Sequence, residues 1–350
     1  MTPASAPAST EPRVLVVVRD HLAHASLSDL PRLLTRGDLL AVNDSGTLPA
    51  SLRATALGKR CELRLARRHE GPGAPQWTVA VFGDGDHQTP TEHRKDAPEL
   101  ATGDTIALDG GAMAEVVDVD RTFPRRILRV QFLDVPGGAS LPPRAAFTAY
   151  VFRHGRPVQY AHVPAPLAPW DIETPFAARP WSVEAPSAGL GLTASTVMAL
   201  HDAGVSVATL THGAGLSSIG DKAHDERLPL PERYSLPPQT VHALSLARRE
   251  GRRVVAVGTT VVRALEGAFR NGDGLDAGEG ETDLILDRDH RLAVVAGVLT
   301  GLHEAGTSHG RLLEAFASAS VLDAAMRSAH AGGYRTHEFG DRMLLWATKG

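Results

Sequence analysis

The segment Val254–Glu266, with the sequence VVAVGTTVVRALE, changes its periodicity at Gly258. The apolar residues before the glycine predict a short buried strand, and the apolar spacing after it predicts a helix. Thr259 and Thr260 therefore stand where a strand ends and a helix begins. At such a junction, hydroxyl and free backbone N–H groups either cap the helix or bind an oxygen-bearing ligand.

Similar junctions occur before and after this segment. Strands are predicted at Val14–Val18, Leu39–Asn43, Val205–Leu210 and Met343–Trp346, and helices at Ser195–Ala203 and Pro238–Glu250. Alternating strands and helices predict a mixed, mostly parallel sheet covered by helices. Ligands of such sheets bind beyond the carboxyl ends of the strands.

A different pattern interrupts this α/β arrangement. Short alternating strands separated by turn residues are predicted at Cys61–Leu65, Trp77–Phe82, Thr105–Leu108, Ala114–Val119 and Ile127–Phe132. Such spacing is typical of a small β-barrel. We therefore predict a flexible tail at 1–10, an α/β domain formed by 11–52 and 150–350, and an inserted barrel at 53–149. The proline-rich stretch Pro136–Pro169 is interpreted as a connector.

Composition restricts the class of protein. The chain has 350 residues, 43% hydrophobic and 22% charged, with a net charge of -4, which is ordinary for a folded globular protein. It shows neither a signal-peptide pattern nor an apolar run of about 20 residues, so we expect a cytoplasmic protein without a membrane segment. Cys61 is the only cysteine, which excludes an internal disulfide. The histidines form no HExxH motif, and no metal site is predicted.

Five segments, in this order, carry a resemblance to a known family. They are GDLLAVNDSGTLPASL (37–52), WSVEAPSAGLGLT (181–193), THGAG (211–215), VVAVGTTVVRALE (254–266) and GDRMLLW (340–346). Together they resemble the S-adenosylmethionine:tRNA ribosyltransferase-isomerases of queuosine biosynthesis. The resemblance implies an α/β domain with an inserted β-barrel. It also implies transfer of the ribosyl group of S-adenosylmethionine to a 7-aminomethyl-7-deazaguanine in tRNA, followed by isomerisation, with release of adenine and methionine.

The resemblance also implies site residues. Three are candidates for acid/base or sulfonium-contacting roles: Asp44, Glu232 and His303. Those expected to bind S-adenosylmethionine, which serves as a substrate, are Asn43, Ala185, Pro186, Ala188, Gly189, Gly213, Gly215, Gly258, Thr259, Thr260 and Arg263. No metal or redox cofactor is required by this chemistry.

Several polar positions depart from the family pattern. Gly46 and Ser51 stand where the family has arginines, and Gly191 stands where it has a histidine. Any contacts to tRNA would then be made by three local basic patches, which begin at Lys59, Arg121 and Arg248. Three hypotheses follow: the family reaction on tRNA, a divergent enzyme using S-adenosylmethionine on a small molecule or on the cofactor itself, and a non-catalytic nucleoside-binding protein. The sequence carries no signal for an oligomeric state.

Overall fold

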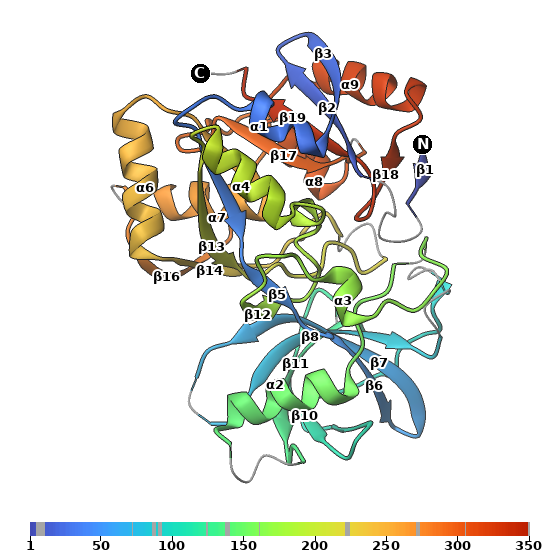
Figure 1. Cartoon of the computed structure of the whole chain (residues 1–350). Coiled ribbons are helices and arrows are strands. Elements are labelled where there is room, and N and C mark those ends of the chain that lie inside the picture. Colours follow the sequence, from blue (N-terminus) through green and yellow to red (C-terminus); the bar gives the residue numbers. More distant parts are fainter. Residues whose placement is uncertain are drawn as a thin grey trace. The chain divides into compact units, whose positions relative to one another are not determined.

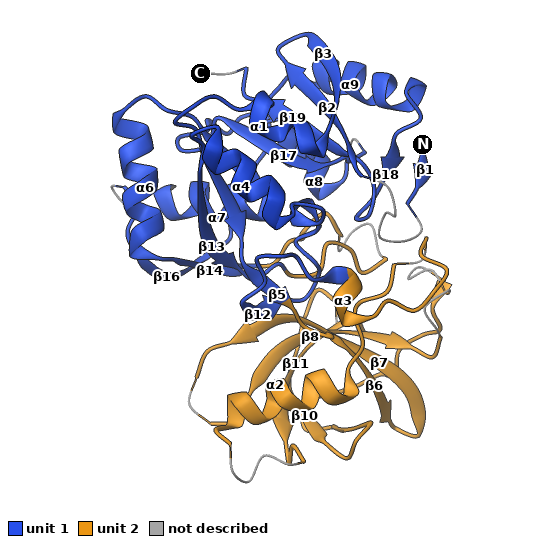
Figure 2. Cartoon of the chain, viewed as in Figure 1, with its two compact units in different colours: residues 1–46, 172–214, 231–350 blue, residues 47–171, 215–230 orange. Residues whose placement is uncertain are grey.

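A computed structural model shows two compact units (Figures 1 and 2). It describes residues 1–4, 11–71, 73–85, 89, 93–123, 125–136, 141–160, 162–220, 225–270, 274–304 and 306–348. Unit 1 comprises residues 1–46, 172–214 and 231–350, and unit 2 comprises residues 47–171 and 215–230. Within the described ranges, no helix is both long enough and apolar enough to cross a membrane.

Unit 1 is built on a nine-stranded mixed sheet. In spatial order its strands are β16 (Gly278–Thr282), β14 (Glu232–Leu236), β13 (Ser206–His212), β4 (Leu39–Asn43), β15 (Val254–Val257), β17 (Gly297–Gly301), β19 (Arg342–Trp346), β2 (Arg13–Val18) and β3 (His21–Ser26). The central strands β13, β4, β15 and β17 are parallel to one another. Strand β4 is buried at every position, because both faces of the sheet are covered.

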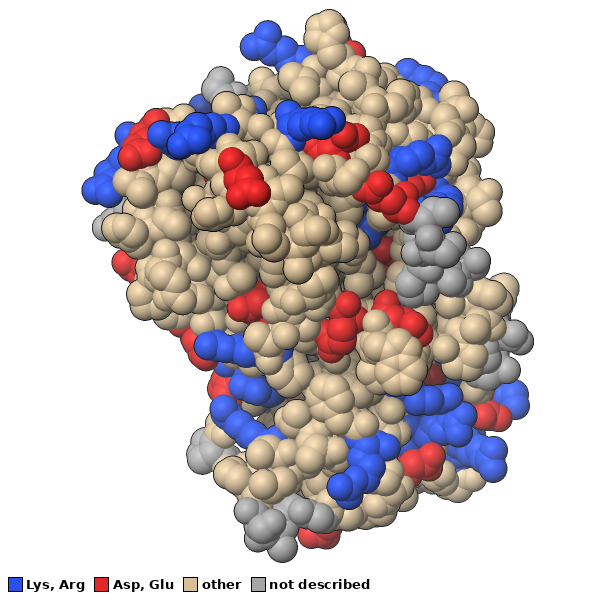
Figure 3. All heavy atoms as spheres, viewed as in Figure 1, with Lys and Arg blue, Asp and Glu red and all other residues tan. Residues whose placement is uncertain are grey.

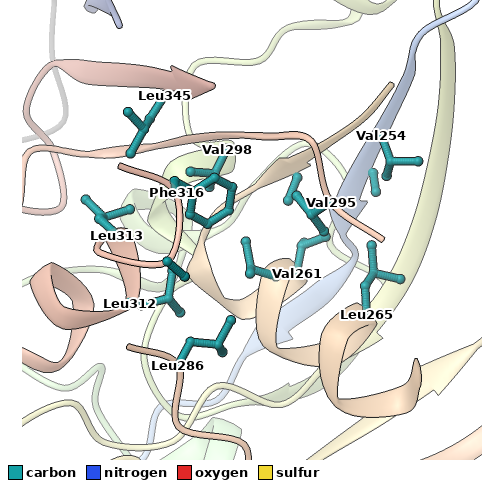
Figure 4. Close-up of a cluster of buried hydrophobic side chains, with 14 of the residues drawn as sticks. Val254, Val261, Leu265, Leu286, Val295, Val298, Leu312, Leu313, Phe316 and Leu345 are labelled. Carbon is teal, nitrogen blue, oxygen red and sulfur yellow. The ribbon is translucent and has the colours of Figure 1, made fainter. Parts of the chain in front are cut away.

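Helices cover both faces of this sheet. Those packed on one face are α6 (Pro238–Arg249), α7 (Thr259–Arg270), α8 (Ser308–Leu313) and α9 (Ala319–Ala331). The 3-10 turn η1 (Leu27–Asp29) and the helices α1 (Leu30–Leu33) and α4 (Ala194–Asp202) contribute to the core of the other face. Figure 4 shows the first core, in which Val261 and Leu265 of α7 lie one helical turn apart and face the sheet.

Unit 2 contains a closed six-stranded barrel. Around the barrel the strands are β10 (Met113–Val119), β11 (Ile127–Leu133), β8 (Gln76–Gly83), β7 (Lys59–His69), β6 (Ser51–Ala56) and β9 (Thr105–Leu108). Alternation along β7 places Cys61, Leu63 and Leu65 in the apolar interior, where each is at most 5% exposed. The residues between them consequently point to the outside of the barrel.

One prediction about the connector was wrong. The stretch Pro136–Pro169 contains a twelve-residue helix, α2 (Pro143–His154), which begins with proline at its first position. Phe147 of α2 packs against Phe132 and Trp77, with ring centroids 4.4 and 5.9 Å apart respectively. Trp77 and Phe132 of the barrel therefore pack against a helix, in a stretch that the sequence analysis interpreted as a connector because of its prolines.

The remaining elements are short. They are α3 (Pro169–Ile172), η3 (Ser187–Gly189), a two-stranded sheet of β5 (Ser45–Thr47) with β12 (Arg179–Ser182), and a parallel pair of β1 (Thr2–Pro3) with β18 (Arg335–Thr336). The tail predicted at 1–10 lies partly outside the described residues, which omit 5–10. The mixed sheet and the barrel confirm the predicted fold class. Unit 2 is larger than the insert predicted at 53–149.

Candidate active site at the strand ends of unit 1

The four parallel strands of unit 1 end along one edge of the sheet. Because β13, β4, β15 and β17 are neighbours, the segments that follow them are neighbours too. This edge carries His212–Gly213, Asn43–Asp44, Gly258–Thr260 and Gly301–His303. Most of the predicted site residues of unit 1 thus come together here from distant parts of the chain.

Asn43 ties three of these segments together. Its side-chain oxygen accepts hydrogen bonds from the backbone N–H groups of His212 (2.9 Å) and Ser45 (3.0 Å). Its amide nitrogen donates to the carbonyl oxygen of His212 (2.9 Å) and to the hydroxyl of Thr260 (3.4 Å). These contacts use both donors and both lone pairs of the amide. Asn43 consequently shapes the edge, and its side chain has no capacity left for a ligand.

Asp44 projects to the opposite face from Asn43, as adjacent residues of an extended chain do. Its carboxylate accepts a hydrogen bond of 2.6 Å from the hydroxyl of Thr211. Among the described residues, no cationic side chain lies within ion-pair distance of it. The side chain is half-buried. A carboxylate in this state keeps its negative charge available for a cation.

A buried ionic cluster lies on the α7 side of the edge. Glu232 forms a short contact with Nη1 of Arg263, and Nε of Arg263 donates to the carbonyl of Leu284 at 3.0 Å. The ring of His212 is fully buried, with Nε2 at 3.2 Å from the Glu232 carboxylate but not aligned for a hydrogen bond. Burial lowers the pKa of Arg263 to about 10. It also lowers the pKa of His212 well below its usual value, and nearby Arg263 adds to this effect. Glu232 and Arg263 therefore neutralise each other, beside an uncharged imidazole.

His303 follows β17 on the same face. Its Nε2 lies 2.9 Å from the hydroxyl of Thr300, and its ring stacks on that of His309 in α8 with centroids 4.7 Å apart and planes 18° apart. Burial lowers the pKa of His303 well below its usual value, and the neighbouring His309, Arg342 and His337 act in the same direction. His303 is thus a neutral, oriented imidazole at pH 7.

Two glycine-containing segments predicted to bind the cofactor meet each other. A Cβ added at Gly258, where φ is +91°, would lie 3.3 Å from the Cβ of Ala188. Ala188 and Gly189 belong to η3, directly after Ala185 and Pro186. The guanidinium of Arg342 fastens this turn by donating to the carbonyl of Ser187 at 2.8 Å. Gly258 is therefore required by the close approach of two chain segments.

Gly213 and Gly215, also predicted to bind S-adenosylmethionine, follow strand β13. A Cβ at Gly213 would lie 3.0 Å from the carbonyl oxygen of Trp181, so the chain after β13 runs closely beside β12. The backbone N–H of Val183 confirms this course by donating to Ala214 O at 2.7 Å. Gly215 belongs to unit 2 and is not grouped with the strand ends of unit 1.

A family model described as "Queuosine biosynthesis protein" matches residues 2–345 of the chain. The chain belongs to this family. It is 35% identical to the S-adenosylmethionine:tRNA ribosyltransferase-isomerase of Thermus thermophilus, with 95% of this chain and 92% of that protein covered. It is 32% identical to the enzyme of the same name from Acidiphilium cryptum, with the same coverage. The resemblance predicted from the five segments is confirmed.

The crystal structure of an S-adenosylmethionine tRNA ribosyltransferase from Thermotoga maritima has the same fold. It matches with a TM-score of 0.50 and 23% sequence identity over 98% of this chain and 95% of that one. The similarity therefore extends through both units of this ribosyltransferase-isomerase family member.

Sequence reasoning missed two groups beside the site of this family member. The first is His309, which stacks on His303. The second is Glu338, whose pKa is raised to about 7 by burial and by the nearby charge of Glu184, with Arg342 opposing the shift. Nothing in the sequence around these residues marks them, because their partners are distant along the chain.

Proposed function

We propose that this protein catalyses the reaction for which its relatives are named, using S-adenosylmethionine as ribosyl donor and tRNA as acceptor. The observation that carries the proposal is the match to the Thermus enzyme over 92% of that protein's length. The acceptor base is a 7-aminomethyl-7-deazaguanine, and the product is the isomerised ribosyl group attached to its amine. The reaction takes place in the cytoplasm and needs no metal.

Within this proposal, Asp44 contacts the sulfonium cation. Of the three predicted catalytic residues, Glu232 is neutralised by Arg263, whereas Asp44 has only a neutral hydroxyl as its partner among the described residues. An unneutralised carboxylate at the strand edge suits a positively charged sulfur. Glu232 is then a positioning residue, which acts through Arg263.

His303 is the proposed proton carrier. The C–H bond next to the sulfonium gives up its proton to an imidazole nitrogen, and its electron pair stays on the carbon, which the positive sulfur stabilises. The same proton later passes from the imidazolium to a nitrogen of the departing adenine, so the imidazole returns to its neutral form. A lowered pKa serves both steps, because the neutral form predominates at pH 7 and the protonated form is a good acid.

The start of α7 is the proposed binding site for the anionic end of the donor. Thr259 and Thr260 begin a twelve-residue helix, and the first backbone N–H groups of a helix favour a carboxylate. The methionine carboxylate of S-adenosylmethionine has this charge.

The test is turnover with purified protein, S-adenosylmethionine and tRNA bearing the aminomethyl-deazaguanine. Adenine and methionine should be released together in equal amounts, and Asp44→Asn should reduce kcat/KM by roughly 100-fold. Asp20→Asn is the matched control, because that carboxylate is 84% exposed on the hairpin after β2. Absence of release from the wild-type protein over several hours, with a relative's enzyme active in parallel, would remove the proposal.

A second candidate is turnover of S-adenosylmethionine without tRNA. It is favoured by one observation, that Gly46 and Ser51 occupy buried positions where the resemblance implies arginines. Mass spectrometry of nucleoside products, from reactions that lack tRNA, distinguishes it from the first. Binding by calorimetry with no product in either reaction would instead support a nucleoside-binding protein without activity.

A further inference from the structure

Unit 2 carries arginines on the outer surface of its barrel that the proposed chemistry does not use. On β6 and β7 the paired rows are Ser51 with Arg64, Arg53 with Glu62, and Thr55 with Arg60. Cross-strand pairs point to the same side of a sheet, and the apolar residues between them fill the barrel interior. Arg53, Arg60 and Arg64 therefore share one outer face with a single carboxylate, that of Glu62.

Further arginines join this face from other segments. The backbone of Arg156 pairs with that of Ser51 through two hydrogen bonds of 2.9 Å, which extends the face beyond β6. On the other side, Arg64, Arg94 and Arg126 surround the ring of Phe82, with guanidinium carbons 4.3, 5.8 and 4.8 Å from its centroid. We call this set the arginine face: Arg53, Arg60, Arg64, Arg94, Arg126 and Arg156.

Glu62 neutralises only the inner part of the arginine face. It contacts Nε of Arg64 and Nη1 of Arg94, both at 2.7 Å, and the hydroxyl of Ser51 at the same distance. Burial opposes ionisation of Glu62, yet Arg64 and Arg94 hold its pKa at about 2. One carboxylate is thus shared by two buried guanidiniums, and within the described residues Arg53, Arg60 and Arg156 form no ion pair with a carboxylate.

The outer arginines are exposed, and two of them, Arg53 and Arg156, repel each other. Arg53, Arg60 and Arg156 are all solvent-exposed. The pKa of Arg156 is lowered by partial burial and then by the nearby charges of Arg53 and Arg94, which Glu62 and Asp109 offset in part. Like charges held close together are stabilised by an external anion. Figure 3 shows Lys and Arg side chains gathered over the part of unit 2 where β6 and β7 lie.

The shape of the arginine face indicates what kind of anion it binds. The rows from Arg60 to Ser51 span four residues of strand, or roughly 13 Å. A single phosphate would contact only one end of such a row, whereas a chain of phosphates follows its length. Guanidinium groups also suit phosphates because they donate two parallel hydrogen bonds.

We propose that the arginine face of unit 2 binds the phosphate backbone of RNA, with Arg53, Arg60 and Arg156 as the direct contacts. Glu62, Arg64 and Arg94 hold the surface in shape. This rests on the proposed function for its choice of polyanion and adds the surface that takes it. Backbone contacts of this kind position the tRNA without reading its sequence.

The experiment measures tRNA binding by fluorescence anisotropy, without S-adenosylmethionine, at 50 to 300 mM salt. The variant Arg53→Ala/Arg156→Ala should weaken binding on the order of tenfold per arginine near 0.1 M salt, and its plot of log K against log salt should be shallower by about 2. The variant Arg53→Lys/Arg156→Lys should keep most of the slope, since a phosphate accepts a point charge. Arg32→Ala is the control, because that side chain is 88% exposed on α1 of unit 1.

Two outcomes would overturn the inference. One is wild-type affinity and slope in the double alanine variant, and the other is weaker binding with an unchanged slope, because that loss would not involve phosphates. Urea unfolding of both double variants checks that unit 2 is intact. Binding and turnover separate the two proposals: wild-type protein that releases no adenine but binds tRNA through these arginines would refute the function and keep the surface. Release of adenine by the double alanine variant, with unaltered tRNA affinity, would keep the proposed function and refute the proposed surface.

Discussion

Glu266 offers the sharpest test of how unit 1 is held together. It lies inside α7 and its side chain is 1% exposed. One carboxylate oxygen accepts from the backbone N–H groups of Val294 (2.9 Å) and Val295 (3.0 Å), and the other accepts from that of Ala293 (2.9 Å) and lies 3.4 Å from His290. The carboxylate thus anchors the chain that enters β17, two positions before the strand begins.

The variant Glu266→Gln changes this arrangement in a defined way. The amide oxygen still accepts from Val294 and Val295, but the amide nitrogen faces the N–H of Ala293, so two donors oppose each other. One charge-assisted hydrogen bond, of about 1.5–3 kcal/mol, is lost, and the part-buried N–H of Ala293 loses its partner at a smaller further cost, of about 0.5–1 kcal/mol. We expect the free energy of unfolding to fall by about 2–4 kcal/mol at pH 7, and by more in Glu266→Ala.

The assay is urea unfolding followed by tryptophan fluorescence at several pH values. Burial acts to raise the pKa of Glu266, but hydrogen bonds from His290 and from the N–H groups of 293–295 outweigh it and hold the pKa below the usual 4.5. The stabilisation is therefore present above pH 4.5 and is lost as the pH falls through the lowered pKa. The difference between wild type and Glu266→Gln should accordingly shrink on acidification.

The control is Glu279→Gln, because the Glu279 side chain is 54% exposed and pairs only at the surface of β16. It should change the free energy of unfolding by less than about 0.5 kcal/mol. A change equally small in Glu266→Gln at pH 7, or a large change that does not vary with pH, would show that the carboxylate does not anchor the entry to β17.

Three further predictions concern single positions in unit 1. Gly267→Ala should destabilise the protein by about 1–3 kcal/mol despite the better helix propensity of alanine, because the new Cβ would lie 2.1 Å from the hydroxyl and 2.6 Å from the Cβ of Thr282; in a Thr282→Gly background, which removes both atoms, the same substitution should cost much less in urea unfolding. Glu338→Gln should stabilise the protein by up to about 3 kcal/mol at pH 8 but not at pH 4, since the wild-type pKa of about 7 means that stability is lost as the pH rises from 4.5 through 7; an equal effect at both pH values would contradict this. The His303 ring should remain neutral at pH 6 in nitrogen NMR of labelled histidine, with His303→Gln to assign the signal; a midpoint near 6.5 would refute the lowered pKa.

Local patterns predicted those elements of both units that depend on neighbouring residues. The switch from an apolar run to helical spacing at Gly258 corresponds to β15 and α7, and the alternation at Cys61–Leu65 corresponds to β7. Both signals arise because a helix or strand buries one or both of its faces. The apolar residues of a buried face then recur with the period of the helix or strand. Helix α2 was missed because prolines at 142 and 143 indicate a loop as readily as a helix start.

The candidate site was predicted in part for the same reason. Strand ends carry short motifs, so Asn43, Gly258 and His303 could be selected from sequence. The roles of these residues could not, because each depends on a partner far away in the chain. The side-chain amide of Asn43 is hydrogen-bonded to His212 and Thr260, and the carboxylate of Glu232 is paired with Arg263.

The sequence by itself determined the family, the mixed sheet with its inserted barrel and the edge at which the strand ends meet, since all three follow from motifs and periodicities within short windows. Only the tertiary structure decided which charged side chains are neutralised by a partner and which are not. Through-space contacts neutralise Glu232, leave Asp44 without a cationic partner among the described residues, stack His309 on His303, and pair Arg64 and Arg94 with Glu62. Electrostatic interactions depend on distance and burial, and neither quantity is written in the order of residues.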